Sequence, residues 1–205
     1  MPCQPLLIGL TGAIGAGKSA VLAAFARRGC ATLSADTIVH TLYHQAPVRD
    51  GIVERFGGEM LGPDGEIDRA AVAAQVFGDS AELAWLERKL HPLVADHLAT
   101  WVAEIRSRSS QPLLIVYESP LLFETGQQDR FDRTLVVTAS DADRHGRLTR
   151  RGGLERLAER EQRQWTDLER NAAADDLIDN SGSLEALEQQ VDAYIARYAG
   201  VRCGG

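Results

Sequence analysis

Eight residues near the start of the chain constrain its fold more than any others, because they form the pattern G-x-x-x-x-G-K-S. The pattern runs from Gly12 to Ser19 and follows an apolar stretch, residues 6–10, that is typical of a buried parallel strand. Residues 20–28 are rich in Ala and predict a helix, which Gly29 ends. A glycine-rich turn between a strand and a helix directs backbone N–H groups at a phosphate, near the positive end of the helix dipole. The pattern therefore predicts a phosphate-binding loop.

The residue types of the loop also indicate which phosphate compound it binds. Lys18 would contact the β- and γ-phosphates of a nucleoside triphosphate, and the Ser19 hydroxyl would bind Mg²⁺. Residues 15–20 also fit the looser dinucleotide pattern G-x-G-x-x-A, and Asp36 lies where that pattern has its ribose-binding acid. Gly12 and the Lys-Ser pair favour the triphosphate. A dinucleotide-binding protein would instead bind NAD and not ATP.

Composition excludes several classes of protein. The chain has 205 residues, enough for one buried core and one insertion, and its net charge of −7 gives no sign of binding to nucleic acid or to a membrane. No apolar run approaches the roughly 20 residues needed to cross a bilayer. The first residues lack the features of a signal peptide, and three scattered cysteines match neither a disulfide framework nor a zinc site. We expect a cytoplasmic protein that is a monomer or a weak homo-oligomer.

Short apolar runs alternate with helical segments along the chain. Further strands are predicted at residues 31–34, 113–117, 134–138 and 176–179. A closing helix is predicted at 184–198, with Ser183 as its N-cap. Strands that alternate with helices form a parallel sheet with right-handed crossovers. We therefore predict an α/β protein with the three-layer P-loop NTPase fold: a five-stranded parallel sheet, a helical substrate-binding insertion and a lid.

Two segments depart from the alternation of strands and helices. Residues 37–99 have apolar residues at helical spacing and no convincing strand, so we predict a helical substrate domain there. Residues 144–170 contain eight arginines, and an arginine-rich helix that closes over ATP would form a lid, although such a helix is also compatible with a solvated surface. The predicted nucleotide-binding core then comprises residues 1–36, 100–143 and 171–205.

Two carboxylates at predicted strand ends are candidates for the chemistry. Asp36 could be the general base that accepts the proton of an alcohol, or the N-cap of a helix that starts near Thr37. Glu118 could support Mg²⁺ through water, or be a solvated strand end. The histidines show no metal spacing, and His91 alone is typical of a structural or capping residue.

Taken together, these stretches resemble the dephospho-CoA kinase family over about residues 7–187. The resemblance rests on Ile8–Ser19, Ser34-Ala-Asp36, Phe56-Gly57, Asp64-Gly-Glu-Ile-Asp-Arg69, Leu90-His-Pro92, Pro120-Leu-Leu-Phe-Glu124, Arg147-Leu-x-x-Arg151, Arg160-x-x-x-Gln164 and Ile178-Asp-Asn-Ser-Gly182. It implies transfer of the γ-phosphoryl group of ATP to the ribose 3′-hydroxyl of dephospho-coenzyme A, with Mg²⁺. An open alternative is a P-loop kinase of another small molecule or of a nucleoside monophosphate. A guanine-nucleotide switch is disfavoured, because neither Asn171 nor Asn180 begins an Asn-Lys-x-Asp motif.

The resemblance also assigns roles to residues. It implies that Asp36, Lys18 and Arg147 are catalytic and that Ser19 and Glu118 bind the metal. The implied ATP-binding residues are Gly12, Gly15, Ala16, Gly17, Lys18, Ser19, Ala20, Arg147 and Arg151. The implied substrate-binding residues are Thr11, Asp36, His91 and Arg160.

The chain departs from the family pattern at several positions. Ala13 and Ala20 stand where the family usually has Gly and Thr, and Glu118 stands where Asp is more frequent. Thr166 replaces a frequent Pro. The lid between Gly153 and Gln164 is about two residues short, so the resemblance gives weaker support to roles for Arg156 and Arg160. None of these departures removes a group that the chemistry needs.

Overall fold

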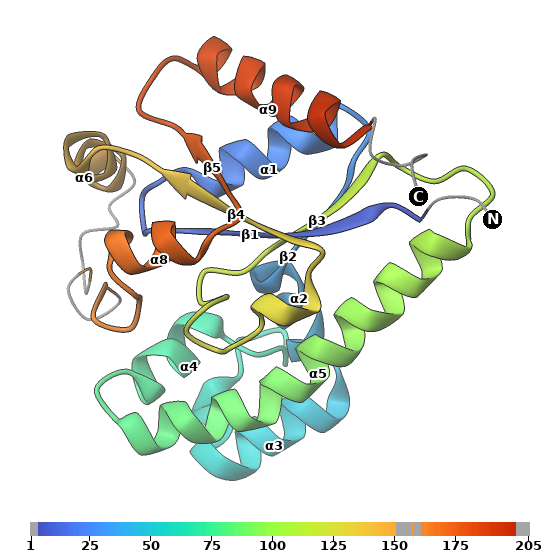
Figure 1. The fold of residues 1–205 in the computed structure, drawn as a ribbon. Coiled ribbons are helices and arrows are strands. Elements are labelled where there is room, and N and C mark those ends of the chain that lie inside the picture. Colours follow the sequence, from blue (N-terminus) through green and yellow to red (C-terminus); the bar gives the residue numbers. More distant parts are fainter. Residues whose placement is uncertain (1–3, 151–156, 158–160, 200–205) are drawn as a thin grey trace. The chain divides into compact units, whose positions relative to one another are not determined.

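The computed structural model describes residues 4–150, 157 and 161–199 (Figure 1). The chain divides into two compact units. Unit 1 comprises residues 1–34 and 105–205, and unit 2 comprises residues 35–104. Each unit is described by itself below.

Unit 1 is built on a sheet of five strands in which all neighbouring strands are parallel. The strands are β1 (Leu6–Gly12), β2 (Ala31–Ser34), β3 (Leu114–Glu118), β4 (Arg133–Thr138) and β5 (Asp176–Asp179). Their order in the sheet is β2-β3-β1-β4-β5, so β1 is central. The predicted five-stranded parallel sheet is confirmed, with each strand within about two residues of its expected position at the ends.

The central position of β1 determines where the phosphate loop lies. On one side Leu10 pairs with Glu118, and on the other Gly12 pairs with Val137. The chain completes the β2 and β3 side of the sheet before it crosses to β4, so the strand order reverses at β1. In open α/β sheets, ligands bind at the carboxyl ends of the strands where this reversal occurs. The loop after Gly12 leaves the sheet at that point.

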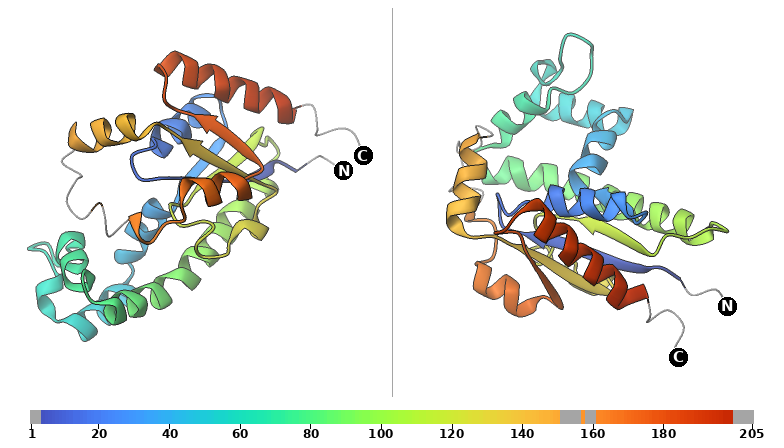
Figure 2. Two further views of the ribbon diagram at one scale, coloured as in Figure 1. Left: turned by 60° about the vertical axis from the view of Figure 1, so that its left-hand side comes forward. Right: turned by 90° about the horizontal axis from the view of Figure 1, so that it is seen from above.

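Helices cover both faces of the sheet (Figures 1 and 2). Helices α1 (Lys18–Arg27) and α9 (Leu184–Ala199) pack together on one face, and α8 (Asp167–Ala173) lies on the other. The core beneath α1 and α9 contains fully buried Ile8 and Leu10, and Phe25 meets Tyr194 edge to face with their ring centroids 5.7 Å apart. The predicted three layers are therefore present.

The remaining elements of unit 1 flank the sheet. They are η2 (Gln128–Arg130) and α6 (Asp141–Arg150). The predicted cap of the last helix is confirmed, because Ser183 Oγ accepts a hydrogen bond of 3.2 Å from the backbone N–H of Ala186.

Unit 2 is helical, as its sequence pattern predicts. Its elements are α2 (Ala35–Tyr43), α3 (Ala46–Phe56), η1 (Gly58–Met60), α4 (Arg69–Val76) and the first part of α5 (Ser80–Ser107). The Asp68 side chain caps α4 by accepting hydrogen bonds from Ala70 N–H and Ala71 N–H. Phe56 packs edge to face on Trp85, and the Arg55 guanidinium makes a two-pronged ion pair with Glu82, at 2.6 and 2.9 Å. Among the described residues, no helix has the length and apolar character needed to cross a membrane.

Candidate nucleotide-binding site

The phosphate loop joins β1 to α1 in unit 1. Gly17 immediately precedes α1 in the left-handed region, at φ 94° and ψ 28°, where a residue with a Cβ is strained. The Lys18 ammonium lies over the loop, with Nζ donating hydrogen bonds to the carbonyls of Gly12 at 2.9 Å and Ala13 at 3.2 Å. Ser19 is exposed in the first turn of the helix. The loop therefore combines a helix N-terminus, a cation and an exposed hydroxyl, which suits a phosphate chain.

Two side chains hold the carbonyl side of this loop. Asn180, which directly follows β5, is buried and donates a 2.8 Å hydrogen bond from Nδ2 to the carbonyl of Ala16. Arg147, from α6, donates to the carbonyls of Ala16 at 3.1 Å and Gly15 at 3.4 Å, and to the carbonyl of Asn180 at 2.5 Å. These two side chains therefore supply donors to the carbonyls of Gly15 and Ala16.

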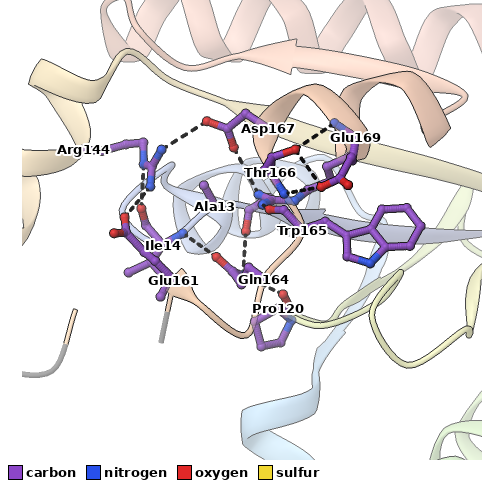
Figure 3. A network of polar contacts seen from close by, with 12 residues as sticks. Ala13, Ile14, Pro120, Arg144, Glu161, Gln164, Trp165, Thr166, Asp167 and Glu169 are labelled. Carbon is purple, nitrogen blue, oxygen red and sulfur yellow. Dashed lines mark hydrogen bonds and ion pairs between the residues drawn. The ribbon is translucent and has the colours of Figure 1, made fainter. Parts of the chain in front are cut away.

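A second set of contacts holds the opening of the loop (Figure 3). Gln164 accepts a hydrogen bond from the N–H of Ile14 and donates to the carbonyl of Pro120. Arg144 donates from Nε to the carbonyl of Ile14 at 2.9 Å. A cavity of about 230 Å³ opens beside Ala13, between these two side chains.

The far wall of this cavity carries a buried charge. Arg170, in α8, is 2% exposed and donates to the carbonyl of Trp165, whose ring stacks on Phe123. Burial lowers the pKa of Arg170, and the carboxylates of Asp167 and Glu124 oppose this effect. At the start of the same helix, hydrogen bonds from Thr166 to Glu169 close a capping box and hold the pKa of the Glu169 carboxyl below its usual value.

The predicted metal ligands both belong to unit 1. Ser19 offers a hydroxyl oxygen, and Glu118 offers a carboxylate at the carboxyl end of β3, next to the strand that precedes the loop. Hydroxyl and carboxylate oxygens are the ligands that Mg²⁺ prefers, and Mg²⁺ usually shares its coordination with phosphates and water. In the part of the chain that the structure describes, no group of three or more His, Cys, Asp or Glu side chains could hold a metal ion. The donor set fits an ion that is held largely by a nucleotide.

Comparison with known proteins identifies the family. The model of the dephospho-CoA kinase family matches residues 6–186 of the chain. A dephospho-CoA kinase of Methylococcus capsulatus is 41% identical over 197 residues, which cover 95% of this chain and 97% of the relative. The chain belongs to the dephospho-CoA kinase family.

Solved structures share the fold of this chain. The Thermus thermophilus protein TT1252 is 33% identical and covers 95% of this chain and 98% of its own, with a TM-score of 0.76. A dephospho-CoA kinase from Campylobacter jejuni, at 22% identity and a TM-score of 0.66, covers 95% of this chain and 97% of its own and shows the same fold. The predictions of an ATP-dependent kinase and of membership in the dephospho-CoA kinase family are confirmed.

The remaining predicted residues of the kinase are found in several environments. Asp36 is exposed in the first turn of α2, two residues beyond β2, and its carboxylate has no hydrogen-bond or ion-pair partner among the described residues. The alternative interpretation of Asp36 as an N-cap is wrong, because α2 already begins at Ala35. His91 is exposed on α5, directly before a proline that the helix accommodates.

Four further predicted residues are Thr11, Ala20, Arg151 and Arg160, and their roles stay predictions. Thr11 is fully buried at the end of β1, and Oγ1 has no hydrogen-bond partner among the described residues, so its contact with substrate stays a prediction. Arg151 and Arg160 lie outside the described residues, and so does Arg156. Ala20 is partly buried in the first turn of α1, and Ala13 is buried, where its carbonyl accepts hydrogen bonds from Lys18 and from the N–H of Ala16.

Sequence reasoning missed Asn180, Gln164 and Arg144 as parts of the site. All three lie in stretches that the family resemblance or the arginine-rich segment had marked, but their partners are backbone atoms of the phosphate loop. A signal was available for Asn180, since it directly follows a strand whose carboxyl end lies at the same edge of the sheet as the loop.

Proposed function

We propose that the protein transfers the γ-phosphoryl group of ATP to the ribose 3′-hydroxyl of dephospho-coenzyme A, giving coenzyme A and ADP. In this reaction the bond between the γ-phosphorus and the bridging oxygen breaks, and a new bond forms to the 3′-oxygen, which loses its proton. The observation that carries the proposal is the phosphate loop at the reversal point of a parallel sheet, with Lys18 Nζ held over it. Family membership supplies the acceptor.

On the ATP side, residues Gly12 and Gly15–Ala20 would surround the phosphates. Lys18 Nζ would exchange the carbonyls of Gly12 and Ala13 for β- and γ-phosphate oxygens. Hydrogen bonds to the phosphates are stronger, because the ammonium and the phosphate oxygen are both charged. Arg147 already donates to two carbonyls of the loop, so we propose that it supports the loop and adds positive charge beside the phosphates. Bound Mg²⁺, held by Ser19 and by Glu118 directly or through water, would neutralise charge on the phosphates.

On the acceptor side, Asp36 would accept the proton of the 3′-hydroxyl. The Asp36 carboxylate is exposed and is not bonded to any of the described side chains, so it is available for this task. Removing the proton as the new bond forms makes the oxygen a better nucleophile, and the carboxylate needs only to reach hydrogen-bond distance. The roles of His91 and Thr11 in holding the acceptor, and of Arg151 and Arg160 in the lid, stay predictions.

We propose that unit 2 is the acceptor-binding domain and that residues 144–170 form the lid. Unit 2 contains a cavity of about 430 Å³ with apolar walls from Val39, Val72 and Leu86, beside the Arg69 guanidinium and Tyr43. Burial raises the pKa of Tyr43, against the opposing charge of Arg69. Apolar walls beside a cation suit an acceptor that carries both an uncharged arm and phosphates. We also propose a cytoplasmic enzyme that is a monomer or a weak homo-oligomer.

A coupled assay with ATP and dephospho-coenzyme A, followed by mass identification of the product, tests this function. We expect ADP release that depends on the acceptor and a product heavier by one phosphoryl group. Phosphorylation of a nucleoside monophosphate or of another small alcohol, but not of dephospho-coenzyme A, would overturn the proposed acceptor. Phosphorylation without added Mg²⁺ in the presence of a chelator would overturn the proposed metal.

Asp36→Asn tests the proposed base. We expect kcat to fall by about 10²- to 10⁴-fold with little change in ATP affinity, because a positioned base contributes on this order. Asp96→Asn is a matched control, since Asp96 is another exposed acid of unit 2, and it should leave turnover unchanged. Near-normal turnover of Asp36→Asn would remove the residue from the mechanism.

A further inference from the structure

The side chain of Gln164 is bonded at both ends of its amide (Figure 3). Oε1 accepts a 3.2 Å hydrogen bond from the N–H of Ile14, and Nε2 donates a 2.7 Å hydrogen bond to the carbonyl of Pro120. Nε2 also lies 3.5 Å from the carbonyl of Gly12. Two carbonyls face one end of the amide and an N–H faces the other, so the partners themselves determine which end is oxygen. Gln164 therefore connects the phosphate loop to the segment that follows β3.

Arg144 completes the hold on the same loop residue. Its Nε donates to the carbonyl of Ile14 at 2.9 Å, so both polar backbone groups of Ile14 are bonded to side chains. The rest of the guanidinium makes ion pairs with Asp141, Glu161 and Asp167, at 3.2, 2.8 and 3.1 Å, and the side chain is 12% exposed. Three carboxylates thus hold the guanidinium in place while it binds the loop.

These contacts determine which groups of the loop a phosphate can use. The N–H of Ile14 is committed to Gln164, so this peptide cannot turn toward a phosphate without losing that bond. The Gly12 carbonyl has two neighbouring donors, Lys18 Nζ at 2.9 Å and Gln164 Nε2 at 3.5 Å. When Lys18 turns to a phosphate oxygen, Gln164 remains beside this carbonyl as its donor. A buried carbonyl that keeps a donor makes the movement of Lys18 less costly.

We propose that Gln164 is a positioning residue of the phosphate loop. Together with Arg144 it fixes the orientation of the Ile14 peptide, and it supplies the donor that the Gly12 carbonyl needs once Lys18 binds nucleotide. This inference rests on the proposed binding of ATP at the loop, but it concerns nucleotide affinity and is independent of the identity of the acceptor.

Two variants of Gln164 separate this role from simple packing. Gln164→Glu keeps the size and the acceptor for Ile14 N–H but replaces the donor with an oxygen that faces the Pro120 and Gly12 carbonyls. Gln164→Ala removes all three contacts without adding repulsion. We expect ATP to bind about tenfold to a hundredfold more weakly to Gln164→Glu, and about threefold to tenfold more weakly to Gln164→Ala. Packing alone would give the opposite order, because alanine leaves the larger gap.

Gln111→Glu is the matched control. Gln111 also donates from Nε2 to a carbonyl of unit 1, that of Arg106 at 2.6 Å, but it lies before β3 and has no contact with the loop. The measurement is titration calorimetry of the full chain with MgATP in the absence of acceptor, together with the thermal midpoint of the nucleotide-free protein and KM for dephospho-coenzyme A. We expect the control to bind ATP normally, and KM for the acceptor to stay within about twofold in all variants.

The outcomes are distinct. Wild-type affinity in both Gln164 variants, or weaker binding by alanine than by glutamate, would overturn the inference. So would equal losses of ATP affinity in Gln164→Glu and Gln111→Glu, since that would indicate a general effect of the added charge. Absence of ATP binding by the unaltered protein would instead overturn the proposed function.

Discussion

Replacing Gly17 with alanine should damage the phosphate loop by an amount that follows from its geometry. A Cβ at Gly17 would lie 2.1 Å from Nδ2 of Asn180, far inside contact distance. The left-handed backbone of Gly17, at φ 94°, costs a residue with a Cβ roughly 1–2 kcal/mol. Displacing the Asn180 side chain breaks its buried hydrogen bond to the Ala16 carbonyl, and unpaired buried groups cost about 1–3 kcal/mol. The free energy of unfolding should therefore fall by roughly 2–5 kcal/mol.

Gly29 provides a control with the same backbone strain and no collision. It has φ 77° just after α1, and a Cβ there would meet nothing within 4 Å. Gly29→Ala should therefore cost only the roughly 1–2 kcal/mol of strain. In a chain of this size each 1 kcal/mol lowers Tm by about 2–4 °C, so denaturant titration and calorimetry resolve the difference between the two variants.

The reasoning also predicts how the loss depends on Asn180. In an Asn180→Ala background the side chain that collides is gone, so Gly17→Ala should cost about as much as Gly29→Ala. Equal losses for Gly17→Ala and Gly29→Ala in the native background would refute the steric argument. A Gly17→Ala loss that is unchanged when Asn180 is removed would refute it as well.

Two further predictions concern charged groups of unit 1. Lys18→Ala should weaken ATP binding by about 10- to 100-fold and also lower kcat, because charge-assisted hydrogen bonds to phosphate are lost. Unchanged kinetics of this variant would contradict the assignment of the phosphate loop. Backbone and side-chain hydrogen bonds from Thr134 hold the pKa of Asp175 below its usual value. The Asp175 carboxylate therefore stabilises the fold at pH values above the pKa that it has in the unfolded chain. This stabilisation is lost as the pH falls through the pKa of the folded state. Asp175→Asn should therefore lower stability by about 1 kcal/mol at pH 7, allowing for solvent screening, and by less as pH falls below about 4, which melting curves at several pH values measure. A deficit that is constant with pH would contradict this pKa argument.

The sheet could be predicted because its strands are buried on both faces. Residues 114–118 are all buried in the structure, and such a strand appears in sequence as a continuous apolar run that ends at a polar residue. The phosphate loop could be predicted as well, since the conformation of its glycines and the Lys-Ser pair are local properties of eight residues. Local patterns predicted these parts because no distant contact is needed to define them.

The supports of the loop could not be predicted in the same way. Asn180 and Gln164 bind backbone atoms that lie 164 and 150 residues away in the chain. Any residue type offers the same backbone groups, so the sequence does not indicate which residue the side chain contacts. For Arg147, helical spacing predicted which residues share its face of the helix, but not which part of the protein that face contacts. The face meets carbonyls of the loop, whereas the family resemblance had implied contact with phosphate. The start of α2 at Ala35 depended on how directly β2 continues into the helix, which propensities do not resolve to one residue.

Backbone N–H groups of a phosphate loop bind the phosphate, so carbonyls on the other side of the loop need donors from elsewhere in the chain. Here the donors come from separate segments: Arg147 and Asn180 bind the carbonyls of Gly15 and Ala16, and Arg144 binds that of Ile14. All three donors lie beyond β4, more than 120 residues after the loop, so the loop acquires them only when the sheet has been completed. The motif thus supplies the capacity to bind phosphate, whereas the orientation of its peptides depends on the arginine-rich segment and on the residue after β5. Substitutions in those segments are expected to change nucleotide affinity even though the motif itself is intact.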